Sequence, residues 1–434
     1  MIFKKFNLAN ILGISIMIKF VVFIFYLYFN EYPFKHEYDY QEVIDNFFLK
    51  NLNINLSFGN ERLPLYQFFL FLNYFIFESK IMISCIQIIL STVNLIIIYK
   101  IGRLFSKNFA LIFVLVSALN PNYILFSFMI LADYLFLFFS LLFIYSFCRF
   151  LIKSKLKYAI ISFIVLGLMS LTKPVIIYYP IFLTLFFIFF QKINKFKCII
   201  LLIVIFYSIN ASWILRNNIT YGNSFYITQN TTNIINWYLP LIEQEEKYIN
   251  IKTAKKNIDN KWSKFKENNP KSNEVPNFLY EDSLAKKFFI MQMKDYKITT
   301  LIKSWINGSL KTLILPTFSE YKYFYEIKPN LKFSNIDGNQ FTDKVKNYFD
   351  NVEFDFYFLI LILSIFFTLL FRLIEFKIFL KFYNQNKKIF FFFLIYISYF
   401  LIVSGPIGSA RYRLPFEIIF IFTLSKWIYF YKKN

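Results

Sequence analysis

The sequence contains very few of the residues on which the familiar soluble catalytic and nucleotide-binding motifs depend. Among its 434 residues there are one histidine, His36, and nine glycines. No G-x-S-x-G motif accompanies His36, so a hydrolase of the Ser-His-Asp type is not indicated. The glycines do not assemble into a Rossmann fingerprint or a Walker motif. The chain therefore gives no sequence signal for a nucleotide-binding site.

Cysteine is also scarce. The three cysteines, Cys85, Cys148 and Cys198, lie in or beside apolar runs and are not closely spaced. This pattern argues against a disulfide framework and against a cysteine-rich metal site.

What the sequence has in abundance is apolar surface. It is 57% apolar and 23% aromatic, with a mean hydropathy of +0.49, whereas a soluble domain of this length needs more polar surface. Runs of about 20 apolar residues recur, the length of a helix that crosses a bilayer. No small-residue cleavage site follows the first run, so we expect it to be retained as a span. We expect spans at 9–29, 81–99, 108–126, 128–148, 158–172, 174–190, 198–215, 353–371, 389–404 and 414–430.

The fold class that this pattern predicts is an all-α polytopic membrane protein with about ten transmembrane helices. We expect three regions: a transmembrane catalytic core at 1–215, an external loop region at 216–352 and C-terminal transmembrane helices at 353–434. Residues 64–77 are apolar but only about 14 long, which predicts a juxtamembrane helix at the external surface. Within the external region, 285–315 predicts a surface helix against the membrane. Its expected apolar side carries Phe288, Met291, Ile298, Leu301, Trp305 and Leu310.

The net charge of +22 is explained by topology and not by binding to nucleic acid. Most basic residues lie in short loops between apolar runs, which is the positive-inside pattern. With both termini in the cytoplasm, the basic loops around 100–107, 149–157, 192–197 and 372–388 are all cytoplasmic. The alternate loops are then external, and the first of them, 30–63, is acidic. Lys19 interrupts the first span, where we expect it to snorkel to the interface.

Five short polar motifs fall on the external side of this topology. They are H-E-Y-D-Y at 36–40, E-R-L-P-L-Y at 61–66, L-A-D at 131–133, W-I-L-R-N at 213–217 and A-R-Y-R-L-P at 410–415. They supply carboxylates and guanidiniums, which a membrane enzyme needs to bind a lipid phosphate and activate a hydroxyl. Their shared location favours an enzyme.

The carboxylates of these motifs suggest two roles. Asp39, flanked by Tyr38 and Tyr40, could act as general base toward an acceptor hydroxyl; the alternative is an ordinary acidic outer loop. Asp133 is an isolated carboxylate near the external end of a span, and such residues are usually functional. Asp133 and Glu61 together could hold a divalent cation through oxygen ligands.

The basic residues of the external side are the second part of the expected site. Lys173, Arg216, Arg411 and Arg413 are all external here, against the positive-inside trend. Each could be anchoring to lipid headgroups, but four of them near an acidic loop favour a phosphate site.

At these residues the chain resembles the GT-C superfamily of integral-membrane glycosyltransferases. The closest likeness is to bacterial protein O-mannosyltransferases, lipid A aminoarabinose transferases and related lipopolysaccharide-core sugar transferases. The resemblance covers about residues 10–240 and the A-R-Y-R-L-P motif. The matching positions are Asp39 in the first external loop; Glu61, Arg62 and Pro64; Asp133 after Pro121; Leu171-Thr172-Lys173-Pro174; Arg216-Asn217; and Arg411-Tyr412. Three positions depart from the family pattern: Val43 replaces a tyrosine, Asp133 a glutamate and Lys173 an arginine.

The resemblance implies an inverting transfer of a sugar from a polyprenyl-phosphate carrier to an extracytoplasmic acceptor: a glycolipid, a cell-surface polysaccharide or a protein. It implies a bacterial plasma-membrane protein whose site faces away from the cytoplasm. Asp39 would be the base, with Glu61 and Asp133 at a possible divalent metal and with Tyr66 and Asn217 against the substrate. The leaving phosphate would be bound by Arg62, Lys173, Arg216, Arg411 and Arg413.

Two other classes remain open from the sequence. A flippase or transporter of lipid-linked sugars would need charges along a path through the membrane, whereas here, Lys19 apart, they are expected at its edges. An O-antigen polymerase or ligase would also span the membrane many times with external arginines. It would be expected to have its large external loop late in the chain and no acidic first loop.

Overall fold

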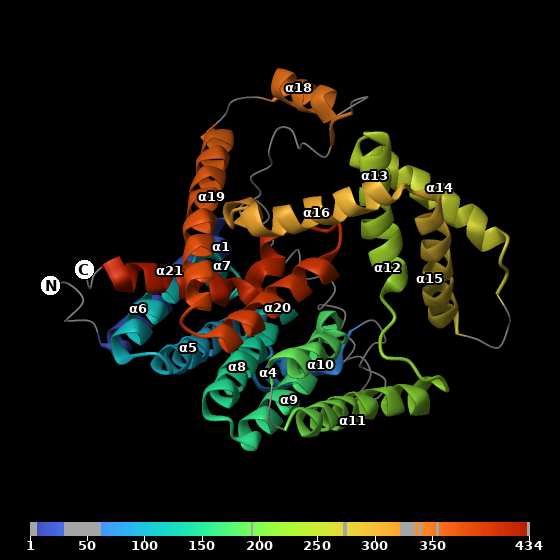
Figure 1. Cartoon of the computed structure of the whole chain (residues 1–434). Helices are drawn as coiled ribbons and strands as arrows, with labels where there is room; N and C mark the ends of the chain where they lie inside the picture. The colour runs from blue at the N-terminus through green and yellow to red at the C-terminus, as the bar shows by residue number, and fades with distance from the viewer. Residues whose placement is uncertain are drawn as a thin grey trace.

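The regular structure of the chain is entirely helical wherever the structure describes it (Figure 1). The computed structural model describes residues 7–29, 62–191, 194–271, 276–321, 335–337, 341–352 and 356–431. Within these ranges there is no β-strand, and several long apolar helices identify an integral membrane protein. The expected all-α polytopic fold is therefore confirmed.

Seven helices of the described chain are long and apolar enough to cross a bilayer. They are α1 (Leu8–Phe29), α5 (Lys80–Arg103), α8 (Ala132–Lys153), α11 (Lys195–Tyr221), α19 (Phe356–Tyr383), α20 (Lys387–Ser404) and the final segment formed by η6 (Ala410–Arg413) with α21 (Leu414–Tyr431). Shorter apolar helices are α4 (Pro64–Phe77), α6 (Lys107–Ala118), α9 (Leu156–Ser170) and η3 (Pro174–Ile176) with α10 (Tyr179–Phe190). Nine of the ten expected spans fall on these helices, and the tenth, 108–126, is divided between α6 and a further short helix at Pro121–Leu125. α4 has the short length expected for 64–77.

Polar residues between the apolar runs set where several helices begin. The side chains of Ser79 and Ser106 accept hydrogen bonds from backbone N–H groups in the first turns of α5 and α6. Asn120 does the same for the short helix α7 (Pro121–Leu125), which has proline at its first position. These residues satisfy N–H groups that have no partner inside the helix. The hydrophobic runs are thus divided into separate helices by local sequence.

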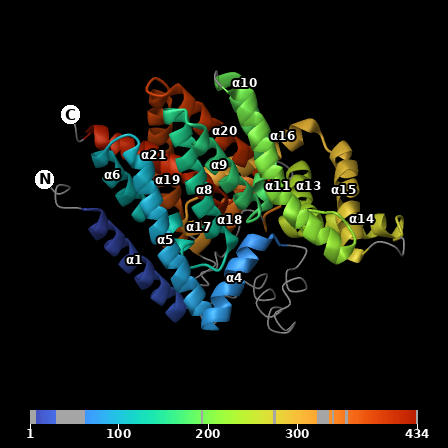
Figure 2. The ribbon, with the colours of Figure 1, turned by 90° about the horizontal axis from the view of Figure 1, so that it is seen from below.

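The helices pack with both ends of the described chain on one side. Figure 2 shows the start of α1, the α5–α6 connection and the end of α21 at the same edge of the bundle. The end of α4 and the beginning of α5 meet at the opposite edge in this view. That both termini are cytoplasmic stays a prediction.

Lys19 does not snorkel as the sequence analysis expected. Its side chain is 1% exposed, and its Nζ donates to Ser91 Oγ on α5 at 2.7 Å. Among the described residues no carboxylate lies within ion-pair distance of it. The expectation was wrong because Lys19 is on the face of α1 that packs on α5, with Ile11, Ser15 and Phe23.

Replacing Lys19 by methionine should raise the thermal unfolding midpoint of the purified protein. Methionine has a similar volume and carries no charge. In the folded protein the Lys19 amine loses its contacts with water and gains one hydrogen bond, which costs on the order of 1 kcal/mol or more of folding free energy. Lys19→Ala should lower the midpoint, because it leaves a cavity. A lower midpoint for Lys19→Met than for the parent would show that the amine itself stabilises the helix contact.

A second group of buried charges lies where α19 meets α21. The expected span 353–371 is longer in the structure, and Arg372 is inside α19 instead of in a cytoplasmic loop. Its guanidinium pairs with Glu375 at 2.5 Å and with Glu417 at 3.0 Å. Arg413 also pairs with Glu417. Two arginines and two glutamates thus form a charge-balanced cluster that the sequence analysis did not expect.

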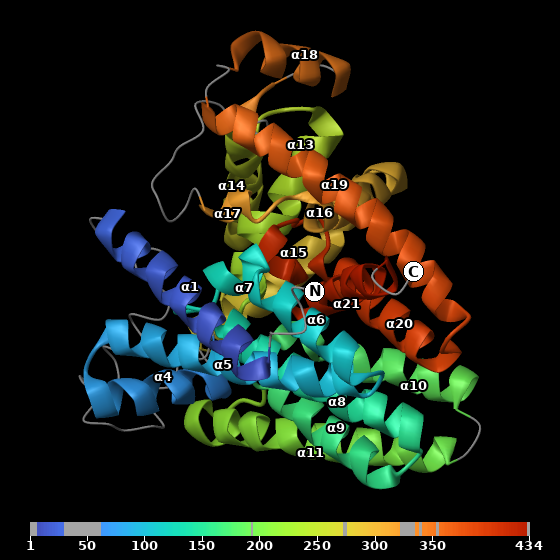
Figure 3. The same cartoon turned by 90° about the vertical axis from the view of Figure 1, so that its left-hand side faces the viewer.

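The external region folds into helices of its own. Its helices are α12 (Asn230–Asn233), the π-helical turn η4 (Ile234–Tyr238), α13 (Leu239–Lys247), α14 (Ile251–Glu267), α15 (Asn277–Asp295), α16 (Ile298–Ile314), α17 (Phe318–Tyr321) and α18 (Phe341–Asn351). In Figure 1, α13, α14 and α15 stand together beside the bundle, and α16 crosses from them toward α19. Figure 3 shows α19 running from near α18 to the turn before α20. The predicted boundary at 215 falls inside α11, which continues to Tyr221.

The expected surface helix at 285–315 is two helices, α15 and α16, and its apolar side was assigned partly wrongly. Phe288 belongs to a small core that the external helices form among themselves, and Leu301 and Trp305 pack against that core. Met291 and Ile298 are exposed as expected. The helix is interrupted at Tyr296 and Lys297, so residues before and after this break do not lie on one continuous helical face. The expected apolar side assumed a single helix and was therefore partly wrong.

Candidate active site

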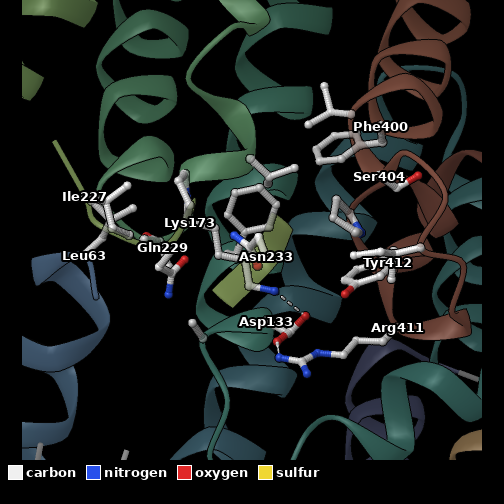
Figure 4. Close-up of a pocket in the computed structure, with 18 of the residues that line it drawn as sticks. Leu63, Asp133, Lys173, Ile227, Gln229, Asn233, Phe400, Ser404, Arg411 and Tyr412 are labelled. Carbon is white, nitrogen blue, oxygen red and sulfur yellow. Dashed lines mark hydrogen bonds and ion pairs between the residues drawn. The ribbon is translucent and has the colours of Figure 1, made fainter. Parts of the chain in front are cut away.

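Three of the five polar motifs, those at 61–66, 131–133 and 410–415, contribute residues to one cavity at the end of the bundle. Its volume is about 390 Å³, within the size range of small-ligand sites. The lining residues are Arg62, Leu63 and Tyr66; Ala132, Asp133 and Phe136; Thr172, Lys173, Pro174, Val175 and Tyr178; Ile227, Gln229, Asn233 and Tyr238; Phe400, Val403, Ser404 and Ile407; and Arg411, Tyr412 and Pro415. They come from the starts of α4 and α8, the turn after α9, the segment after α11 and the connection from α20 to α21. Residues separated by most of the chain therefore share one pocket (Figure 4).

Asp133 is held between two cations in this cavity. Lys173 Nζ lies 2.6 Å from Asp133 Oδ1, and Arg411 Nη2 lies 2.6 Å from Asp133 Oδ2 (Figure 4). The Asp133 side chain is 4% exposed, whereas Lys173 and Arg411 are 22% and 35% exposed. The carboxylate is thus buried beneath two cations that still reach the cavity.

Local sequence explains where Asp133 and Lys173 lie. Asp133 is in the first turn of α8, where free N–H groups and the helix dipole favour a negative charge. Lys173 directly precedes Pro174, has an extended backbone and follows the end of α9. The backbone N–H of Leu65 donates to the carbonyl of Leu171 at 3.1 Å. This bond joins the start of α4, and with it Arg62, to the turn that carries Lys173.

Arg411 is positioned by a tightly packed connection between α20 and η6. Ser409 caps η6 by accepting from the Arg411 backbone N–H at 3.1 Å, and its hydroxyl donates to Glu320 Oε1 at 2.6 Å. Gly405 ends α20 with φ of 61°, a conformation that favours glycine. A Cβ on Gly405 would lie 2.6 Å from the ring of Tyr238. The external region therefore packs directly on the connection that presents Arg411.

The cavity carries an excess of positive charge. Among the described residues, its lining contains three cations, Arg62, Lys173 and Arg411, and one carboxylate, Asp133. A partly buried site with this balance attracts anions more strongly than the same charges would in water. Burial lowers the pKa of Lys173 to about 8, although Asp133 opposes the shift. Lys173 is therefore a cation whose charge is sensitive to mildly alkaline pH.

Affinity for a phosphate ligand should fall as pH rises through about 8, because Lys173 loses its proton there. A phosphate monoester is already doubly charged above about pH 6, so the ligand's own charge does not change in this window. Lys173→Arg should abolish the fall, since a guanidinium stays protonated. Binding isotherms for a polyprenyl phosphate at several pH values between about 7 and 9 would test this. An equal fall in both proteins would assign the titration to another group.

Arg62 and Tyr66 enter the cavity from α4. The Arg62 carbonyl accepts from Gln67 Nε2 at 2.8 Å, which fixes the start of the helix. The Tyr66 hydroxyl donates to Gln87 Oε1 on α5 at 2.8 Å, and Tyr66 is 1% exposed. The cavity therefore unites five of the residues expected from sequence: Arg62, Tyr66, Asp133, Lys173 and Arg411.

Three expected residues lie elsewhere in the structure. The Arg216 guanidinium stacks on the Trp213 ring at 4.7 Å and donates to Asn217 Oδ1 at 2.9 Å. Asn217 is buried and donates to the Phe225 carbonyl at 2.9 Å. These contacts stabilise the end of α11 and the chain that follows it. Neither Arg216 nor Asn217 is among the residues that line the cavity.

Arg413 points away from the cavity although it is two residues from Arg411. Its Nη1 donates to the carbonyls of Thr312, Leu313 and Leu315 at 3.0, 3.2 and 3.0 Å, where α16 ends. These are carbonyls left without partners at a helix C-terminus. Together with the pair to Glu417, these bonds explain the burial of Arg413 and hold its guanidinium outside the cavity.

Several cavity residues were not identified from sequence. Gln229 and Asn233 follow α11, and Tyr238 ends the π-helical turn. The polar run T-Q-N-T-T-N at 228–233 was the available signal, because it lies shortly after an apolar helix, α11, which ends at Tyr221. Tyr412 also lines the cavity. Amide and hydroxyl groups of this kind suit recognition of a ligand rich in hydroxyls.

Asp39 and Glu61 lie outside the described residues, so the expected base and half of the expected metal pair are not placed. The other half, Asp133, has both oxygens bound by cations. Among the described residues, no three His, Cys, Asp or Glu side chains gather as metal ligands would. A hard divalent cation needs several oxygen ligands. The described residues do not fit such an ion, and the chemistry below involves none.

A protein-family model and a solved structure are similar to this chain. A sequence model of the dolichyl-phosphate-mannose-protein mannosyltransferase family matches residues 62–214. No curated protein sequence matches the chain. Among solved structures, the chain is similar to the oligosaccharyltransferase AglB of the archaeon Archaeoglobus fulgidus, solved with an inhibitory peptide and a dolichol-phosphate. The TM-score is 0.51 at 12% identity, over 99% of this chain and 51% of AglB, so the likeness concerns the fold and about half of AglB's length.

Proposed function

We propose that this chain, a GT-C superfamily member by its family match and its fold, transfers a sugar from a polyprenyl-phosphate donor to an extracytoplasmic acceptor. The observation that carries the proposal is the cavity in which Lys173 and Arg411 flank the buried Asp133, with Arg62 in the same lining. An excess of cations at the end of a transmembrane bundle is suited to a lipid-linked phosphate. The acceptor is a glycolipid, a surface polysaccharide or a protein.

The donor phosphate would meet Lys173 and Arg411 from the cavity. Each already gives one hydrogen bond to Asp133, and a guanidinium has further N–H groups for a second partner. Asp133 therefore orients the two cations beside the cavity that they line. Because these cations are fixed before the donor arrives, they stabilise developing phosphate charge without rearrangement.

The proposed reaction is a single displacement with inversion. The acceptor hydroxyl oxygen forms a bond to the anomeric carbon while the bond from that carbon to the phosphate oxygen breaks. The phosphate leaves with the bonding electrons, and its charge is met by Lys173 and Arg411. The acceptor's proton passes to a general base, and we assign that role to Asp39 from its position in the H-E-Y-D-Y motif.

The proposed orientation places the cavity on the extracytoplasmic side of a bacterial plasma membrane, with both termini in the cytoplasm. Ser224 follows α11 and Ser154 connects α8 to α9, and both are exposed. Cysteine at 224 should react with a membrane-impermeant thiol reagent in intact cells, and cysteine at 154 only after permeabilisation. Any labelling of the native cysteines Cys85, Cys148 and Cys198 is measured in the parent protein and subtracted. The reverse labelling pattern would overturn the orientation.

The proposed function is tested by comparing the glycoconjugates of cells with and without the gene. Lipid, polysaccharide and protein fractions should include one species that loses a sugar and regains it on complementation with the parent chain. The Lys155→Gln variant should complement equally, because Lys155 is exposed and lies in the connection before α9, remote from the cavity lining. Unchanged glycoconjugates together with altered transport of a lipid-linked sugar would favour the transporter class instead.

A further inference from the structure

Helix α16 of the external region has two faces of opposite character. One face carries Ser304, Gly308 and Thr312, which are buried. A Cβ on Gly308 would lie 2.2 Å from the Gly405 carbonyl oxygen, so no larger residue fits without movement. The buried face of α16 therefore packs against the connection between α20 and η6 that presents Arg411.

The opposite face is a continuous row of large aliphatic side chains. Ile298, Ile302, Ile306 and Leu310 are 74%, 56%, 52% and 46% exposed. They recur every fourth residue, which places them in one row along an α-helix. Ile306 lies two positions after the buried Ser304, and Leu310 two positions after the buried Gly308. Two positions correspond to a rotation of about 200° around an α-helix. The row thus points almost directly away from the protein.

This polarity is the reverse of that of a helix on the water-exposed surface of a protein. Such a helix buries its apolar face and exposes its polar face. In α16 the fully buried residues Ser304, Gly308 and Thr312 are small or polar, and Leu301 and Trp305 pack only partly against the core of the external helices. The branched aliphatic residues of the row face outward instead. Lys303, next to the row, pairs with Glu245 of α13 at 2.5 Å and so belongs to the contact of α16 with the rest of the external region. The outward row is explained if lipid, and not water, covers it.

The neighbours of α16 support lipid as the occupant. α16 contacts both α19 and α20, and Figure 1 shows it crossing toward α19. α19 is a candidate span with outward side chains such as Phe366, 59% exposed. On the α20 side, Trp305 Nε1 donates to the Ile402 carbonyl at 3.2 Å, and Ile402 is 54% exposed. The aliphatic row therefore continues a surface that the spans present to acyl chains.

We propose that the outward face of α16, formed by Ile298, Ile302, Ile306 and Leu310, is seated in the lipid bilayer at its external interface. The seat holds α16 against Gly405 and so keeps the connection that carries Arg411 in place at the cavity. This inference concerns where α16 lies and does not depend on the reaction that the cavity performs.

Tryptophan fluorescence in lipid nanodiscs tests the proposal. Ile302→Trp and, independently, Ile306→Trp add a reporter to the outward row. Phe366→Trp on α19 is the membrane control and Lys256→Trp, on an exposed position of α14, is the aqueous control. The emission added by each substitution is obtained by subtracting the parent protein, which has five tryptophans. It is measured with ordinary lipids, with lipids brominated on the acyl chains and with acrylamide.

The proposal predicts that brominated lipids reduce the added emission at 302 and 306 by a fraction comparable to that at 366, with little change at 256. It is overturned if the added emission at both positions resists brominated lipids and is quenched by acrylamide as it is at 256. It is also overturned if both positions resist both quenchers and a cysteine at 302 cross-links two copies, which would assign the row to a second copy of the chain.

Discussion

Replacing Arg411 by lysine is expected to reduce sugar transfer by about tenfold to a hundredfold, although the positive charge is retained. Removing one preorganised donor from a site of developing negative charge commonly costs a factor of about 100 or more. Lysine keeps part of this effect as a point charge. Initial rates with purified protein and a synthetic polyprenyl-phosphate sugar would measure the loss.

The reason lies in how Arg411 is bound. Its Nη2 already donates to Asp133 Oδ2 at 2.6 Å, and the planar guanidinium has other N–H groups that can face the donor phosphate. A lysine amine at this position keeps the charge, but it is a point charge on a flexible stem and lacks the fixed, planar fork of N–H groups with which arginine can bind a phosphate. The expected loss is therefore in the rate of transfer more than in protein stability.

The exposed base Lys155, which connects α8 to α9, supplies the matched control, because Lys155→Gln removes a charge outside the cavity lining. Its rate should equal that of the parent. Full activity and unchanged donor affinity in Arg411→Lys would mean that Arg411 only neutralises Asp133, and the phosphate site would have to be sought elsewhere.

Replacing Asp39 by asparagine is expected to reduce transfer by at least about a hundredfold, the usual scale for loss of a general base. Asparagine keeps the size of the side chain but cannot accept the proton that the acceptor hydroxyl loses. The same assay measures the effect, with expression and membrane insertion checked first. Binding of polyprenyl phosphate should be preserved, since Arg411 and Lys173 are untouched.

The other acidic residues of the first external loop are the natural comparison for Asp39. Glu37→Gln and Glu42→Gln should retain most activity if Asp39 is the base. Near-normal turnover in Asp39→Asn would transfer the role to Glu37, Glu42 or Glu61.

The sequence predicted most of the long apolar helices, because each bilayer span requires a continuous run of apolar residues that is visible in the local sequence. The same runs, read with the basic loops, placed Asp133, Lys173 and Arg411 on one side of the membrane before any contact was known. Sequence could not reveal that these three residues form one ion-paired group. Arg411 and Asp133 are 278 positions apart, and their contact depends on how the helices pack.

The residues that were misplaced share a physical cause. Arg411 and Arg413 are equivalent by composition, but the turn of η6 sends Arg411 to the cavity and Arg413 to the end of α16. Lys19 interrupts an apolar run, and only the packing of α1 on α5 decides whether it is buried or reaches the interface. Side-chain direction within a helix or turn, unlike hydropathy, is set by tertiary contacts.

The most direct test of the account is the binding of polyprenyl phosphate to the purified protein in lipid nanodiscs. The parent chain and Lys155→Gln should bind it saturably and in preference to the uncharged polyprenol. Arg411→Met and Lys173→Met should each bind it about tenfold or more weakly, as expected for losing a charged hydrogen-bond partner. Equal binding by all four proteins, or equal binding of the phosphate and the alcohol, would contradict the claim that this cavity recognises a lipid-linked phosphate.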